Sequence, residues 1–213
     1  YGKKAVYTPN YVLNRSLKPY IADRPFDTIR LIYFGRVSES KNVDVVIKVA
    51  YELEKAGYKT STTVIGGYTE AYKAKLEQTI KEYRLDNDKV QIIGQQPFDK
   101  ICDALQKVHF FVFPSQEKME GHSNSLTEAM TFGVVPVVST AGFNASIVGN
   151  KELVVDSIDP MKYARVIESV IEKNVWSEYS LAVYRRIKEN YTEDIVKKNI
   201  LCAVDELEDG ENE

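Results

Sequence analysis

Residues 109–115 read HFFVFPS and residues 134–139 read VVPVVS, and the stretch EGHSNSLTEAM (residues 120–130) lies between them. Both flanking runs are short, apolar and rich in aromatic or β-branched residues, which is typical of strands buried in a parallel sheet. The polar stretch between them leads into a predicted helix from about Asn124 to Phe132, which Gly133 ends. This order of strand, polar loop, helix and strand predicts one unit of an α/β fold.

The same alternation continues along the chain in both directions, and right-handed crossovers leave few topologies open. We therefore expect an α/β fold with a doubly wound, mostly parallel six-stranded Rossmann-like sheet and C-terminal helices. Strands are predicted at residues 28–35, 60–67, 89–94, 110–113, 134–139 and 151–155, with helices at residues 42–56, 69–83, 99–108 and 124–132 and a further helix after residue 155.

The two ends of the chain do not fit this sheet unit. Residues 1–27 predict a leading strand and a linker, residues 28–176 the Rossmann-like domain, residues 177–208 C-terminal helices, and residues 209–213 an acidic tail. The last predicted helix carries an apolar stripe, which leaves two alternatives open: it packs on the sheet unit, or it packs on a neighbour outside this chain. The stripe consists of Val196, Ile200, Ala203, Val204 and Leu207.

Composition narrows the possible ligands. The formal net charge is −3, and the nine residues from 205 to 213 hold six acids and no base. Without those six negative charges the remaining body has a formal charge of +3, which suits a small anionic ligand and gives no reason to expect nucleic acid. With two cysteines and two histidines, no structural zinc site is expected. Because no signal peptide or long apolar run is visible, we expect a cytoplasmic protein.

Ligands of open α/β sheets bind beyond the carboxyl ends of the strands. The helix predicted after residue 123 begins in a run of small polar residues, and a helix start with its unpaired N–H groups is a ready anion site. The alternative is a purely structural role in capping the helix, since Ser123 and Asn124 are common caps and Ser125 with Glu128 fits the S-x-x-E capping box. Both interpretations stay open at this point.

The loop after the first strand favours an anion. Arg36 and Lys41 flank a turn that should face the same crevice, and two cations beside a helix start suit a diphosphate. Gly66 and Gly67 follow the second strand, but they do not form G-x-G-x-x-G, and no phosphate loop of the G-x-x-x-x-G-K type is present. These absences argue against NAD oxidoreductases and nucleoside triphosphatases.

Taken together, these motifs resemble the carboxyl-terminal, donor-binding half of a retaining glycosyltransferase of family 4, which has the GT-B architecture of two facing Rossmann-like domains. The stretch LIYFGRVSESKNVDVVIKV (residues 31–49) resembles the donor phosphate site of that family. The stretch from residue 110 to residue 140 carries its E-x7-E element as Glu120 and Glu128. The spacing alone is weak, but in order with Gly35-Arg36, Lys41 and Pro136 it is specific.

The resemblance implies a role for each matching residue. Arg36 and Lys41 would neutralise the donor diphosphate, Glu120 would hydrogen-bond the transferred sugar, and Glu128 would hold the ribose. Backbone N–H groups near Ser123 would meet the sugar and the distal phosphate, and the loop at Gln95 would lie near the base. The catalytic residues implied are Glu120, Arg36 and Lys41, and the donor-binding residues are Gly35, Gly66, Gln96, Gly121, His122, Ser123, Asn124, Ser125 and Glu128.

The resemblance also sets limits. Many relatives have Phe-Gly where this chain has His122-Ser123, which puts the placement of the sugar in doubt. No metal and no cofactor is expected beyond the UDP- or GDP-sugar donor. The chain begins at Tyr1 and has no room for an amino-terminal acceptor domain, so we expect a piece of a longer enzyme, with association to the inner membrane face through that domain as one option. The alternatives are another GT-B enzyme, a phosphorylase or nucleotide-sugar epimerase, or a non-catalytic nucleotide-binding module.

Overall fold

The computed structural model describes residues 8–13, 20, 23–86, 88–117 and 120–209. Six parallel strands form one sheet in the order β3-β2-β1-β4-β5-β6. β1 lies at the centre of the sheet. From β1 the chain passes outward through β2 to β3, returns to β4 beside β1, and passes outward through β5 to β6. The predicted doubly wound sheet is therefore confirmed, and every strand pair in it is parallel. The strands are β1 (Ile29–Phe34), β2 (Thr60–Ile65), β3 (Val90–Ile93), β4 (Phe110–Phe113), β5 (Val135–Ser139) and β6 (Val154–Val155).

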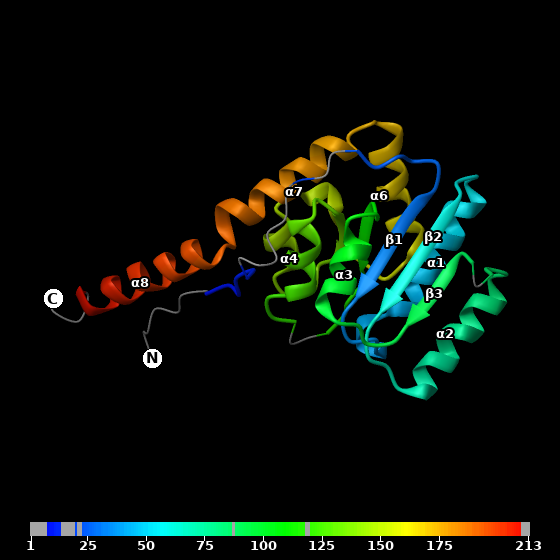
Figure 1. The fold of residues 1–213 in the computed structure, drawn as a ribbon, viewed down its shortest axis with the longest axis horizontal. Coiled ribbons are helices and arrows are strands. Elements are labelled where there is room, and N and C mark those ends of the chain that lie inside the picture. Colours follow the sequence, from blue (N-terminus) through cyan, green and yellow to red (C-terminus); the bar gives the residue numbers. More distant parts are fainter. Residues whose placement is uncertain (1–7, 14–19, 21–22, 87, 118–119, 210–213) are drawn as a thin grey trace.

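Helices cover both faces of the sheet (Figure 1). On one face α1 packs against α6, and on the other α4 packs against α7. The α-helices are α1 (Val43–Lys55), α2 (Glu70–Glu82), α3 (Phe98–Leu105), α4 (Asn124–Thr131), α5 (Asn144–Val148), α6 (Pro160–Glu172), α7 (Trp176–Asn190) and α8 (Glu193–Asp209), and the 3-10 turns are η2 (Glu39–Lys41) and η3 (Lys151–Leu153).

Local chemistry explains where these elements begin. The Thr69 hydroxyl accepts a hydrogen bond from Tyr72 N and caps α2, and Asp159 caps α6 one residue before Pro160. All four residues of β4 are buried, as expected for a central strand covered on both faces. The helix α5 was not predicted, because its five residues are too few to show a helical period.

The segment before β1 is tied to the sheet unit by a buried arginine. The Arg24 guanidinium donates hydrogen bonds to the carbonyls of Val108 and Phe132, and it lies 5.6 Å from the ring centroid of Trp176. Burial lowers the pKa of Arg24 to about 10. The first half of the predicted leading strand, residues 3–7 of residues 3–12, lies outside the described residues. The division into domains stays a prediction, with boundaries at residues 1–27, 28–176, 177–208 and 209–213.

The end of the chain projects from the sheet unit. Figure 1 shows α8 extending away from the other helices. Val196 in its first turns is 1% exposed, whereas Ile200 and Val204 are 38% and 45% exposed. The apolar stripe therefore packs on the sheet unit at Val196, whereas Ile200 and Val204 are exposed to the solvent among the described residues.

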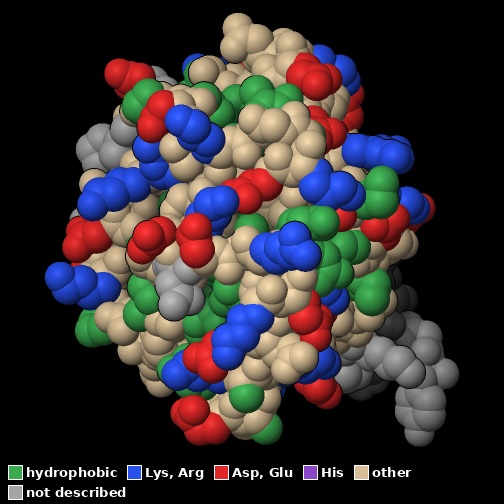
Figure 2. Space-filling model, turned by 90° about the vertical axis from the view of Figure 1, so that its right-hand side faces the viewer, with side chains coloured by type: hydrophobic (Ala, Val, Ile, Leu, Met, Phe, Trp, Pro, Cys, Tyr) green, Lys and Arg blue, Asp and Glu red, His purple; other side chains and the backbone are tan. Residues whose placement is uncertain are grey.

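The surface carries mixed charge on the face shown in Figure 2, where basic and acidic side chains alternate over short hydrophobic patches. This face presents no continuous basic patch of the kind that tracks a phosphate backbone. Among the helices of the described residues, none has the length and apolar character needed to cross a bilayer.

Candidate functional site

A cavity of about 530 Å³ opens at the carboxyl ends of β1 and β2, beside the start of α4. This is the switch point at which the chain leaves β1 toward one edge of the sheet and β4 toward the other, the usual ligand site of such sheets. The described lining brings together seven of the predicted site residues: Gly35, Arg36, Gly66, Gln96, Asn124, Ser125 and Glu128, and Gln95 lies with them.

The floor of this cavity depends on Gly66. Its φ of +153° lies in a region that L side chains rarely adopt, and a Cβ placed there would lie 1.7 Å from the carbonyl oxygen of Gly35. The loops after β1 and β2 therefore touch backbone to backbone, which only glycine permits. A ligand in the cavity meets main-chain atoms directly at this point.

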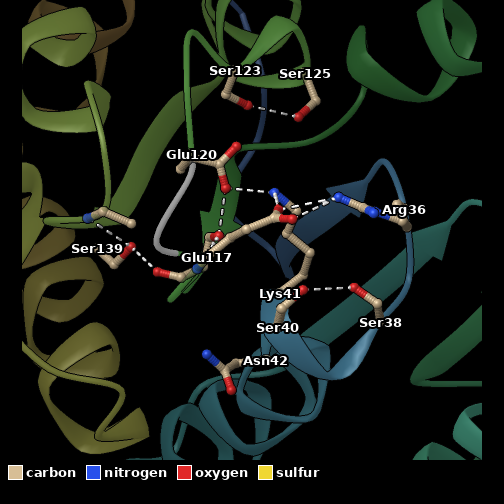
Figure 3. A network of polar contacts seen from close by, with 12 residues as sticks. Arg36, Ser38, Ser40, Lys41, Asn42, Glu117, Glu120, Ser123, Ser125 and Ser139 are labelled. Atoms are coloured by element: carbon tan, nitrogen blue, oxygen red, sulfur yellow. Dashed lines mark hydrogen bonds and ion pairs between the residues drawn. The ribbon is translucent and has the colours of Figure 1, made fainter.

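Arg36 and Lys41 converge on one carboxylate. Lys41 Nζ lies 2.5 Å from Glu117 Oε2, and Arg36 Nη2 donates to Glu117 Oε1 at 2.9 Å. Lys41 Nζ also donates to Glu120 Oε2 at 2.5 Å. Figure 3 shows the two cations reaching toward the same centre from neighbouring turns after β1. Hydrogen bonds from the Lys41 side chain lower the pKa of Glu117, and the charge of Arg36 acts in the same direction.

The turn that carries Lys41 is fixed to the loop after β4. Asn42 Nδ2 donates to the Pro114 carbonyl at 2.9 Å, and Gln116 N donates to the Ser40 carbonyl at 3.0 Å. The Lys41 side chain is only 9% exposed and its ammonium lies 5.4 Å from the ring centroid of Phe113. These contacts hold the nearly buried Lys41 ammonium in one orientation.

Glu120 is held in place on three sides. Its Oε2 accepts hydrogen bonds from Lys41 Nζ and from Ser115 Oγ, the latter at 2.5 Å. Its backbone packs against Gly142, where a Cβ would lie 1.9 Å from the Glu120 carbonyl oxygen. Its other carboxylate oxygen points toward Ser123 and Ser125 at the start of α4 (Figure 3). A carboxylate held so firmly, with one oxygen turned to the α4 start, can accept a hydrogen bond from a ligand hydroxyl.

The local capping alternative fails at the start of α4. Ser123 is the N-cap residue but its side chain does not cap the helix; instead its Oγ lies 3.2 Å from Ser125 Oγ. Because α4 begins at Asn124, Ser125 is already inside the helix and Glu128 is too far along to complete a capping box with it. The first N–H groups of this helix receive no side-chain cap from Ser123, and Asn124 and Ser125 at the helix start line the cavity.

Glu128 instead lines the cavity. Burial raises the pKa of its carboxyl to about 7 from an ordinary value near 4.5. No other described residue makes a hydrogen bond or ion pair with it. A half-buried carboxyl at a cavity wall, without a partner among the described residues, is suited to take hydrogen bonds from a ligand.

The residues around the start of α4 differ in burial and in their contacts. Gly121 is exposed, and a Cβ placed there would meet no atom within 4 Å. The His122 ring lies 5.3 Å from the Tyr191 ring, and burial lowers the pKa of His122 to about 4. Asn10 Nδ2 donates to Asn124 Oδ1 at 2.9 Å. Of the predicted donor-binding residues, Gly121, His122 and Ser123 are not in the described lining of the cavity, so the prediction for them concerns their backbone alone.

Glu117 is the main residue that the sequence did not reveal. It bridges both predicted cations, yet in the sequence it is one of several acids in a loop. The contact between Ser115 and Glu120 depends on the fold, so the sequence does not show it. The sequence signal that could have indicated Glu117 and Ser115 is their position, because residues just past the carboxyl end of a central strand face the ligand crevice.

Comparison with known proteins shows the family of the chain. The family model described as Glycosyl transferases group 1 matches residues 21–193. One subunit of the phosphatidylinositol N-acetylglucosaminyltransferase from Arabidopsis thaliana is 24% identical over 168 residues, which cover 79% of this chain and 36% of that protein. This chain therefore spans about a third of that relative's length.

Solved structures agree on the fold. Sucrose-phosphate synthase from Thermosynechococcus elongatus superposes with a TM-score of 0.77 at 18% identity, over 95% of this chain and 52% of that one. The Anabaena protein Alr3699/HepE in complex with UDP superposes with a TM-score of 0.74 at 16% identity, over 84% of this chain and 49% of that one. At these identities the likeness establishes the fold alone, and it covers about half of each neighbour.

Proposed function

Because the chain belongs to the group 1 glycosyl transferases, we propose that it is the nucleotide-sugar-binding half of an enzyme that moves a sugar from a UDP- or GDP-sugar to a glycan or lipid-linked acceptor. One observation carries the proposal. Arg36 and Lys41 meet at Glu117, and Arg36 lines the same cavity as Gln96, Ser125 and Glu128. This combination of paired cations, a helix start and a carboxylate suits a nucleoside diphosphate.

The diphosphate would take the place of the Glu117 carboxylate between the two cations. Departure of the nucleoside diphosphate builds negative charge on the β-phosphate, and preorganised cations stabilise that charge as it develops. Lys41 is suited to this because its turn is fixed and its ammonium is nearly buried. We propose that these cations and the α4 start do this without a metal ion.

The remaining parts of the donor fit the other residues. The ribose hydroxyls would bind the Glu128 carboxyl, the base would lie against Gln95 and Gln96, and the transferred sugar would bind the Glu120 carboxylate oxygen that points toward the α4 start. The relative from Arabidopsis thaliana is named as a sugar transferase, which favours transfer over the phosphorylase, epimerase and non-catalytic alternatives. Membership of family 4, the retaining outcome and a cytoplasmic location remain part of this proposal.

The chain spans only part of its relatives, so we propose that an amino-terminal domain supplies the remainder of the acceptor site and any contact with a membrane surface. A screen of nucleotide sugars by thermal shift, followed by calorimetry, tests the donor assignment on this chain alone. We expect binding of UDP or GDP and of one of their sugars, and a loss of preference for ribose over deoxyribose nucleotides in Glu128→Gln. Absence of any nucleotide binding would favour the non-catalytic alternative.

A further inference from the structure

A second, smaller cavity lies on the other side of the charged network. Its volume is about 260 Å³, and it opens at the carboxyl ends of β4, β5 and β6. The two cavities share no lining residue among those described. Figure 3 shows Ser139, which lines the second cavity, across Glu117 and Glu120 from Arg36, which lines the first.

The floor of this second cavity is continuous with the Glu120 carboxylate. Ser115 and Ser139 are 0% and 5% exposed and both line it. Ser139 Oγ donates to the Ser115 carbonyl at 2.5 Å, and Ser115 Oγ donates to Glu120 Oε2 at 2.5 Å. A ligand in the cavity is therefore separated from Glu120 by one hydroxyl group.

The chemistry of the lining selects a class of ligand. It contains the carboxylates of Glu117 and Asp156, the hydroxyls of Thr140 and Ser157, and the apolar edge of Ile158. The described lining contains two carboxylates and no cation, which disfavours a phosphate. Carboxylates and hydroxyls accept and donate hydrogen bonds to sugar hydroxyls, and the C–H face of a ring suits an apolar edge. The volume lies below the usual range for drug-sized ligands, which fits a single sugar ring.

We propose that this cavity is an acceptor subsite that binds a neutral, hydroxyl-rich sugar ring at the end of the acceptor. The inference rests on the proposed function, because it places the donor diphosphate at Arg36 and Lys41 and the transferred sugar at Glu120. An attacking hydroxyl must come within about 3–3.5 Å of the reacting carbon, so the acceptor ring lies next to the transferred sugar. The cavity beside Ser115 is on the side of Glu120 away from the nucleotide.

The test uses this chain saturated with UDP and a panel of neutral probes, the methyl glycosides of glucose, galactose, mannose and N-acetylglucosamine, observed by ligand NMR. We expect at least one glycoside to bind in the millimolar range, and glucose 1-phosphate to bind more weakly than the matching glucoside. Ala141→Leu fills the cavity, and Asp156→Asn removes one acceptor charge. Loss of one exposed hydrogen bond to a charged group weakens binding by up to roughly 5-fold, which we expect for Asp156→Asn. Ala141→Leu should weaken binding more, because its side chain occupies the cavity.

Lys162→Met is the matched control. Lys162 Nζ pairs with Asp156 Oδ1 at 2.8 Å, so this variant breaks the same ion pair without altering the described lining, and glycoside binding should persist.

If no glycoside binds while UDP does, or if Lys162→Met has the same effect as Asp156→Asn, the subsite is wrong and the donor site stands. If the variants weaken a nucleotide sugar more than UDP, the cavity holds the donor sugar and the acceptor assignment is overturned. If UDP and GDP both fail to bind, the proposed function itself fails.

Discussion

Lys41 Nζ and Glu120 Oε2 lie 2.5 Å apart, although the two residues are 79 positions apart in the sequence. The fold brings them together because β1 and β4 are neighbours at the centre of the sheet and both turns leave their carboxyl ends. The pair joins the predicted phosphate cation to the predicted sugar carboxylate. A single contact thus connects leaving-group stabilisation with sugar placement.

Glu117 competes with the donor for both cations. We expect Glu117→Gln to bind UDP or GDP roughly 2- to 5-fold more tightly, because the diphosphate no longer has to displace a charged partner from Arg36 and Lys41. Isothermal titration calorimetry measures the change, with the exposed Glu178→Gln as control. Weaker nucleotide binding in Glu117→Gln, with an unchanged control, would show that Glu117 positions the cations for the donor instead.

Gly66 and Gly67 form a matched pair for testing the cavity floor. A Cβ at Gly66 meets the Gly35 carbonyl, whereas at Gly67 the nearest atom is Gln95 Oε1 at 4.0 Å. We expect Gly66→Ala to lose about 2 kcal/mol or more of unfolding free energy, since backbone must shift and the φ is strained, and to bind nucleotide poorly. Gly67→Ala should change stability by less than about 1 kcal/mol. Chemical denaturation measures both, and equal losses would contradict the backbone contact.

The Glu128 carboxyl gives a pH signature. Its pKa is raised to about 7 in the folded state and is near 4.5 when unfolded. Between those values the folded state holds a proton that the unfolded state releases, so this group lowers stability as pH rises from 4.5 through 7. Glu128→Gln cannot ionise, so its stability relative to wild type should rise over this window and level off above it, by on the order of 1–3 kcal/mol.

Denaturation of both proteins at pH 5, 6, 7 and 8 provides the measurement, with Glu178→Gln as the control for general effects of charge. A constant difference between Glu128→Gln and wild type across this range would mean that the carboxyl is not buried in the folded protein. Nucleotide binding at the same pH values then reports whether the ligand shifts this titration.

Much of the fold could be predicted from the sequence, because most strands are short apolar or β-branched runs and the longer helices show a helical period, whereas α5 is too short to show one. The placement of Gly66 and Arg36 at one cavity could be predicted because each follows a strand at the carboxyl edge of the sheet, while the roles of these residues and of Lys41 stay predictions. Glu117 was not, because an acid in a polar loop looks the same whether it is solvated or paired. Ser125 and Glu128 have the spacing of a capping box. Whether they form one depends on the residue at which the helix begins, and the sequence does not fix that residue.

The central claim is that Arg36 and Lys41 bind one diphosphate, and calorimetric titration of UDP and GDP into charge variants tests it most directly. Lys41→Met removes a nearly buried charge-assisted hydrogen bond worth about 1.5–3 kcal/mol, so affinity should fall roughly 10- to 150-fold. Arg36→Gln should lose less, because its side chain is 66% exposed. Lys48→Met, which breaks the partly buried pair with Asp44 outside the described lining of the cavity, should bind as wild type does. Unchanged affinity for both nucleotides in Lys41→Met and in Arg36→Gln would contradict the account.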